Sequence, residues 1–95
     1  MKKENLKLLI EHDVDAGVII KNMDNGEITE NIHFLIETLR KNNAEQYVEL
    51  LLEKGINVNI IVPELNANEI IGDIDTLIEY DVDIDLIANI LNSEA

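Results

Sequence analysis

The sequence contains no cysteine and no tryptophan, a single proline, and only two tyrosines and one phenylalanine among 95 residues. Without cysteine the chain forms neither a disulfide framework nor a thiolate metal site, which is typical of proteins from a reducing compartment, and we expect a cytoplasmic protein. Because 46% of the residues are hydrophobic but few are aromatic, the core must be aliphatic. This length accommodates one small domain, so we expect residues 1–95 to form a single acidic α-helical domain.

Basic residues are scarce, and none follows Lys54. Seven Lys and Arg oppose 20 Asp and Glu, which gives a formal charge of −13. A surface of this sign repels phosphates, so the composition excludes direct binding to DNA or RNA and disfavours anionic membranes. No apolar run approaches the roughly 18 residues that span a bilayer. The charged residues that follow Met1 leave no apolar segment for a secretory signal.

Motifs for catalysis, for metal binding and for cofactors are also lacking. The only serine is Ser93, and the four glycines are isolated, so there is neither a nucleophile elbow nor a phosphate-binding loop. A calcium-binding EF-hand that began at Asp81 would need Gly at its sixth position and Glu at its twelfth, where the sequence has Leu86 and Asn92. We therefore expect no enzymatic activity, no metal and no cofactor.

A short motif occurs three times, over residues 9–15, 51–57 and 77–83. In each copy an apolar helix end is followed by a tight turn, a Val or Ile, and then Asp15, Asn57 or Asp83. Side chains of these types accept hydrogen bonds from the first N–H groups of a helix, which predicts three N-caps. An apolar residue precedes each cap and another lies four residues after it, as in a hydrophobic staple. The motif predicts helix–turn–helix units.

Apolar residues at helical spacing predict further helices, over residues 3–12, 30–42, 43–55, 67–80 and 84–92. The predicted fold is all-α, with six or seven short helices in successive hairpins, arranged as a solenoid or as an orthogonal bundle. Residues 56–62 alternate between apolar and polar as a strand would, but Pro63 limits regular structure on either side. For this segment we predict a short helical turn followed by a bend.

Residues 43–59 have the sequence Asn-Ala-Glu-Gln-Tyr-Val-Glu-Leu-Leu-Leu-Glu-Lys-Gly-Ile-Asn-Val-Asn, and Asp-Asn-Gly at 24–26 precedes Thr29 and Ile-His at 32–33. The first stretch resembles the second helix and exit turn of an ankyrin repeat, and the second resembles the turn and first helix. The Thr-Pro-Leu-His start of that family and its 33-residue period are absent. The resemblance covers residues 24–59 and implies a helical-repeat surface for protein binding.

Carboxylates three or four residues apart on a helix lie about 5–6 Å from one another. Duplex DNA presents one charge per about 1.7 Å of its axis, so rows of such carboxylates imitate part of a phosphate track. The predicted partner-binding residues are Glu45, Glu49, Glu53, Asp73, Asp75, Glu79, Asp81, Asp83 and Asp85. They predict a non-enzymatic inhibitor that blocks the nucleic-acid site of a basic protein, such as a host nuclease, in the manner of phage anti-restriction or anti-CRISPR proteins.

Three alternatives remain open from the sequence. In the first alternative, the acidic face serves only to keep an aliphatic domain in solution, which is the commoner role of charge runs. A helical interaction or immunity-type module binds instead through exposed apolar residues among Ile60, Ile61, Val62 and Leu65. A homodimer forms by stacking of the open ends of a solenoid, with Ile90 in the contact.

Overall fold

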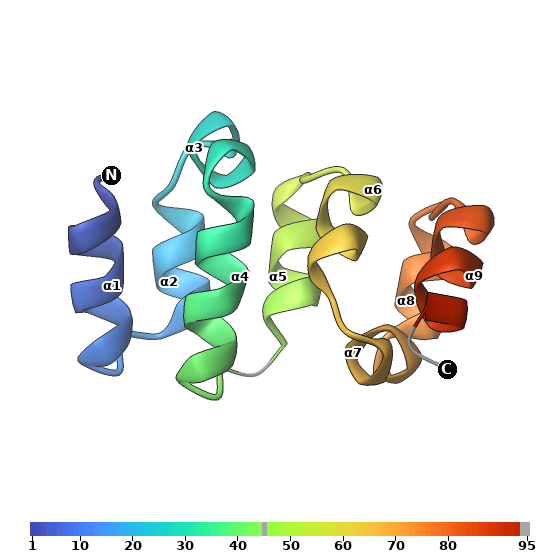
Figure 1. Cartoon of the computed structure of the whole chain (residues 1–95). Helices are drawn as coiled ribbons and strands as arrows, with labels where there is room; N and C mark the ends of the chain where they lie inside the picture. The colour runs from blue at the N-terminus through green and yellow to red at the C-terminus, as the bar shows by residue number, and fades with distance from the viewer. Residues whose placement is uncertain (45, 94–95) are drawn as a thin grey trace. The chain divides into compact units, whose positions relative to one another are not determined.

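The computed structural model describes residues 1–44 and 46–93, and all the regular elements in these ranges are helical (Figure 1). The predicted all-α class is confirmed. The elements are α1 (Lys3–Glu11), α2 (Ala16–Lys21), α3 (Asn25–Glu30), α4 (Ile32–Lys41), α5 (Tyr47–Lys54), α6 (Val58–Ile61), the 3₁₀ helix η1 (Val62–Glu64), α7 (Ala67–Gly72), α8 (Ile74–Glu79) and α9 (Ile84–Ser93).

The described residues form more helices than the six or seven expected, and the helices are shorter. The predicted helix over residues 67–80 is divided at Asp73, whose φ of −112° and ψ of 16° lie outside helical geometry. Asn31 divides α3 from α4 with nearly the same angles, −112° and 19°. Short polar side chains of this kind compete with the backbone for hydrogen bonds, which favours a helix boundary. The helical turn predicted after Asn57 is confirmed as α6, and η1 holds Pro63 in its first turn.

Contacts between Cα atoms divide the chain into two units, residues 1–56 (the N-terminal unit) and residues 57–95 (the C-terminal unit). In the N-terminal unit α1 packs on α2 and α4, α3 packs on α4, and α2 packs on α5. Within the C-terminal unit α9 packs on η1 and α7, and α7 packs on α8. Each unit has its own aliphatic core; almost completely buried are Leu6, Met23, Ile28, Leu35, Ile36, Leu39 and Leu51 in the first, and Ile61, Val62, Ile70 and Leu77 in the second.

The helix order repeats with a spacing of 42 residues, so α2, α3 and α4 correspond to α6–η1, α7 and α8. The carboxylates of Glu27 and Glu69 accept the backbone N–H groups of Asp24 and Asn66, at 3.1 and 3.0 Å, at the starts of α3 and α7. The buried residues match in pairs: Ile19 with Ile61, Ile20 with Val62, Met23 with Leu65, Ile28 with Ile70 and Leu35 with Leu77. The chain therefore contains two copies of a pattern longer than the short motif found in the sequence.

The three predicted N-caps are confirmed. The side chains of Asp15, Asn57 and Asp83 each accept the N–H two residues further along, at 2.7, 2.8 and 3.0 Å. In all three copies the apolar residue before the cap and the one four positions after it are buried or half-buried. This burial agrees with the predicted staples, and each cap satisfies a backbone N–H that would otherwise lack a partner.

Left-handed residues close the helices that precede these caps. Asp13, Gly55 and Asp81 have φ angles of 58°, 98° and 61°. At each, two backbone N–H groups bond back to carbonyls of the last helical turn in a Schellman motif. The same arrangement at Asn43, with φ of 56°, was not predicted, because Ala44 stands where the other copies have Val or Ile.

These turns make a first testable prediction. Gly55→Ala should lower the free energy of unfolding by about 1 kcal/mol or more, because a Cβ is strained at a φ of 98°. The converse change, Asp81→Gly, should raise it by about 0.5 kcal/mol, since it removes a Cβ from a left-handed residue. Urea unfolding followed by circular dichroism at the helical minimum measures both. Gly55→Ala with unchanged stability would contradict the left-handed turn.

Candidate acidic interface

The nine carboxylates predicted to bind a partner are divided between the two units. Glu49 and Glu53 lie on α5 in the N-terminal unit, half-buried and exposed respectively, and Glu45 lies outside the described residues. The remaining six belong to the C-terminal unit and are called here the acidic surface: Asp73, Asp75, Glu79, Asp81, Asp83 and Asp85. The structure therefore groups most of the predicted site in one unit but does not unite all nine residues there.

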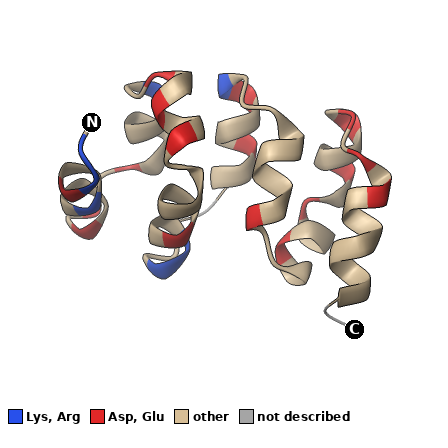
Figure 2. Cartoon of the chain, turned by 45° about the horizontal axis from the view of Figure 1, so that its top comes forward, with Lys and Arg blue, Asp and Glu red and all other residues tan. Residues whose placement is uncertain are grey.

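The C-terminal unit is built without any basic side chain, since residues 57–95 contain no Lys, Arg or His. In Figure 2 the blue of Lys and Arg ends with α5, and the helices that follow show acidic residues alone. The N-terminal unit differs because it contains internal ion pairs, such as Lys41 with Glu37 at 3.3 Å. No such pair can form within the C-terminal unit, so no basic side chain of its own offsets the repulsion among its carboxylates.

Four exposed acids occupy every second position across the turn from α8 to α9: Glu79, Asp81, Asp83 and Asp85. Asp83 caps α9 and its own N–H donates to Asn59 Oδ1 at 2.9 Å, which ties the start of α9 to α6. A negative charge near the start of a helix is favourable, so helix stability alone explains Asp83 and Asp85.

Helix stability does not explain the other two acids of this turn. Glu79 is the last residue of α8, where a carboxylate meets the negative end of the helix dipole at a cost of about 0.3–1 kcal/mol. Asp81 occupies a left-handed position where Gly or Asn is the usual residue. Neither placement favours folding, and both side chains face solvent. These two residues are therefore the strongest candidates for contact with a partner.

Asp73 differs from the other members of the acidic surface because it is half-buried between α7 and α8. Burial raises the pKa of its carboxyl group, and the neighbouring charge of Glu69 raises that pKa further. A carboxylate whose charged form is disfavoured and whose surface is partly covered is a poor contact for a basic partner. We therefore expect Asp73 to affect the stability of the fold and not the binding of a partner.

The apolar residues proposed as an alternative contact are not available at the surface. Ile61 and Val62 are completely buried, Leu65 is buried, and Ile60 is half-buried, so this part of the sequence interpretation is wrong. These residues are internal because α6 and η1 turn their apolar sides toward the core of the unit. The exposed apolar side chains of the C-terminal unit, which the sequence analysis missed, are Ile71, Ile78, Tyr80 and Ile84.

Within residues 1–44 and 46–93, no three His, Asp or Glu side chains are grouped so that they could hold a metal ion. In the same ranges no helix combines the length and the apolar character that crossing a bilayer requires.

Comparison of the chain with protein-family models, with curated proteins and with solved structures found no match. The ankyrin-like interpretation of residues 24–59 stays a prediction.

Proposed function

We propose that this protein is a non-enzymatic acidic inhibitor. It binds a basic protein, such as a host nuclease, and covers the site at which that protein holds nucleic acid. Inhibitors of this kind belong to the anti-restriction and anti-CRISPR class found in phages and mobile elements, and they act in the cytoplasm. The observation that supports the proposal is the run of exposed carboxylates from Glu79 to Asp85 in a unit without a single basic side chain.

The electrostatics of the C-terminal unit favour this function over a purely solubilising role. Eight carboxylates and no Lys, Arg or His lie in residues 57–93, so the net charge of this unit is strongly negative. Such a field steers a positively charged partner and is relieved when the partner binds. Solubility alone does not require an acid at the carboxyl end of α8 or at the left-handed position that follows it.

A second candidate is a helical interaction module that binds through apolar side chains, including as a homodimer. The observation that favours it is the exposure of Ile71, Ile78 and Ile84, at 61%, 52% and 57%. Large aliphatic side chains exposed to this degree are typical of contact surfaces when several belong to one small unit. Binding through them would depend little on salt, whereas binding through the carboxylates would weaken steeply.

The test uses the whole chain immobilised as bait for a panel of purified basic nucleases, at about 50 mM and about 500 mM salt. Under the proposal, binding is lost at high salt and DNA competes with it. Neutralising three acids should weaken binding by about tenfold or more, at up to about 1 kcal/mol for each lost pair. This variant combines Glu79→Gln, Asp81→Asn and Asp85→Asn.

The matched control removes the same charge from exposed acids of the N-terminal unit, by Glu4→Gln, Glu11→Gln and Glu30→Gln. It should leave the affinity within about threefold of the parent protein. Equal losses in the two triple variants would show a non-specific effect of net charge and contradict the proposed site. Binding that resists salt and is lost in Ile78→Asp would replace the proposal with the second candidate.

A further inference from the structure

The N-terminal unit contains the one Asn-Gly pair of the sequence, Asn25 followed by Gly26, at the start of α3. In such a pair the backbone nitrogen of the glycine can attack the side-chain carbonyl of the asparagine, because no Cβ shields that nitrogen. Both residues are exposed to solvent. A Cβ at Gly26 would have no neighbour within 4 Å from other described parts of the chain, so there is space for the reaction.

The backbone N–H of Gly26 is not held by a hydrogen bond. The first N–H groups of a helix have no carbonyl of their own helix to bond with. Within residues 1–44 and 46–93, the N–H of Gly26 has no other partner. Helical backbone angles keep this nitrogen away from Cγ of Asn25, but α3 has six residues, and so short a helix opens readily at its end.

We propose that Asn25–Gly26 is a site of spontaneous deamidation, and that the reaction releases α3 from the end of α5. The Gly26 nitrogen bonds to Cγ of Asn25, and the amide nitrogen leaves as ammonia with the proton of the Gly26 N–H, which gives a cyclic imide. Water then opens the imide at either carbonyl, to an aspartate or an isoaspartate at position 25. The site is independent of the proposed inhibitory function, because the acidic surface belongs to the other unit.

The reaction removes a hydrogen bond that joins two helices of the N-terminal unit. Asn25 Nδ2 donates to the carbonyl oxygen of Lys54, the last residue of α5, at 3.1 Å. A carboxylate at position 25 has no N–H to donate and places a second acceptor against that carbonyl oxygen. An isoaspartate also adds a methylene to the backbone, which displaces the first turn of α3. Either product therefore separates α3 from the end of α5.

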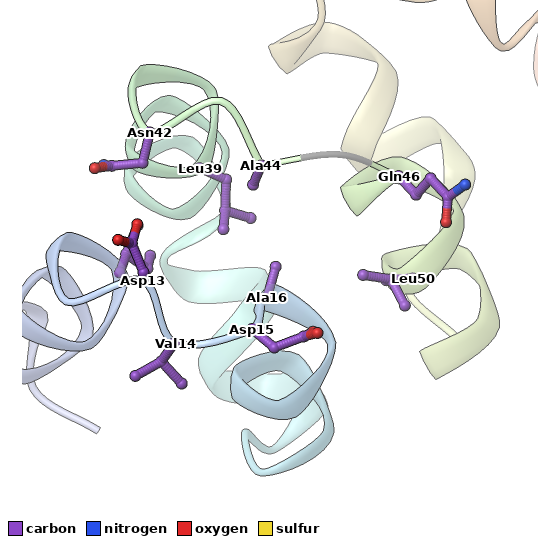
Figure 3. A pocket seen from close by; sticks show the side chains of 10 residues that line it. Asp13, Val14, Asp15, Ala16, Leu39, Asn42, Ala44, Gln46 and Leu50 are labelled. Atoms are coloured by element: carbon purple, nitrogen blue, oxygen red, sulfur yellow. The ribbon is translucent and has the colours of Figure 1, made fainter.

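This hydrogen bond matters because α5 is incompletely packed on its neighbours. A pocket of about 380 Å³ lies between the start of α5, the end of α4 and the α1–α2 turn, and Figure 3 shows Leu50 and Leu39 on opposite sides of it. A second pocket, of about 270 Å³, lies between α2 and α5. Beside these hollows, α5 is held by the Asn25 bond and by the bond from Lys54 Nζ to the carbonyl oxygen of Lys21, at 3.0 Å.

The test is incubation of the full chain at mildly alkaline pH, with peptide mapping by mass spectrometry at intervals. Asn68 is the internal control, because it is exposed in the first turn of α7, the counterpart of α3, but is followed by Glu69. Asn25 should be converted at least about tenfold faster than Asn68, a margin that corresponds to a barrier lower by about 1.4 kcal/mol. An isoaspartyl methyltransferase should label the peptide that contains position 25.

Gly26→Ala is the matched variant for the chemical step. The alanine Cβ has space at this position, and the variant keeps Asn25 and its hydrogen bond to Lys54. Conversion at position 25 should slow by about tenfold or more, since the added Cβ hinders the attack and raises the barrier. Equal rates for Asn25 and Asn68, or an unchanged rate in Gly26→Ala, would overturn the proposal.

Amide hydrogen exchange on Asn25→Asp measures the effect on the helices. The control is Asn5→Asp, which adds the same charge to the first turn of α1, where the asparagine side chain has no hydrogen-bond partner among the described residues. Exchange in α3 and α5 should be about fivefold faster in Asn25→Asp than in Asn5→Asp, as the loss of one hydrogen bond gives. Equal exchange in the two variants would overturn the proposed release of α3.

Discussion

Ile36→Ala should lower the free energy of unfolding by about 2–5 kcal/mol, whereas Ile78→Ala should lower it by less than about 1 kcal/mol. The two isoleucines are 42 residues apart and hold the same position in the repeated pattern. Only 1% of Ile36 is exposed to solvent, against 52% of Ile78. Removing a buried side chain costs its transfer free energy and leaves a cavity, but a half-exposed side chain leaves no cavity.

The difference in burial has a structural cause within each unit. In the N-terminal unit α4 packs on both α1 and α3. In the C-terminal unit α8 and α7 are the counterparts of α4 and α3. Within the C-terminal unit α8 packs on α7, and half of the Ile78 side chain stays exposed to solvent.

Urea unfolding gives the overall stability of these two variants, and amide hydrogen exchange reports the effect on each unit. Both should be measured at two protein concentrations. A large loss for Ile78→Ala only at the higher concentration would indicate that self-association buries Ile78. Equal losses for the two variants in dilute solution would contradict the difference in burial.

The second prediction exchanges Asn and Asp at the two positions that divide helices, Asn31 between α3 and α4 and Asp73 between α7 and α8. Asp73→Asn should raise the free energy of unfolding by about 1 kcal/mol at neutral pH, and Asn31→Asp should lower it by about 1–2 kcal/mol. Asn31 Nδ2 donates a hydrogen bond to the carbonyl oxygen of Glu27 at 2.9 Å. Asp73 has nearly the same backbone angles and the equivalent carbonyl, that of Glu69, but its carboxylate has no N–H to donate.

The effect of Asp73→Asn should depend on pH. Burial, and then the charge of Glu69, raise the pKa of Asp73 above its ordinary 3.8. The protonated carboxyl group is thus favoured in the folded state, and its contribution to stability is complete below pH 3.8 and is lost as the pH rises through the raised pKa. The advantage of Asp73→Asn is therefore greatest at neutral pH and should shrink as the solution is acidified.

Urea titrations between neutral pH and about pH 3 measure this dependence. The control is Asp75→Asn, which removes the same charge from an exposed residue of α8 and should change stability by less than about 0.5 kcal/mol at neutral pH. A stabilisation by Asp73→Asn that persists undiminished in acid would show that the hydrogen bond alone is responsible.

The turns and caps could be predicted from the sequence because each is decided by residues within about four positions of one another. The caps at Asp15, Asn57 and Asp83 could be predicted from the residues next to them, and all three caps are present. The breaks at Asn31 and Asp73 could not be predicted from periodicity, since apolar spacing continues across both positions. Hydrophobic spacing shows which residues lie inward but does not show where a helix changes direction.

The acidic surface, like the fold, could be predicted from the sequence only in part. The lack of cations after Lys54 is a property of the sequence, so the acidic surface could be proposed from it. The placement of Glu49 and Glu53 in the other unit, and the partial burial of Asp73, depend on tertiary contacts.

The repetition of one helix order every 42 residues has a consequence for engineering. Residues 15–37 and 57–79 begin with the same kind of cap and share the same internal boundaries, so each stretch brings its own start and stop signals. A chimaera that replaces one stretch with the other should keep its helices while its charge changes. The net charge of the protein could then be changed one stretch at a time without changing the order of its helices.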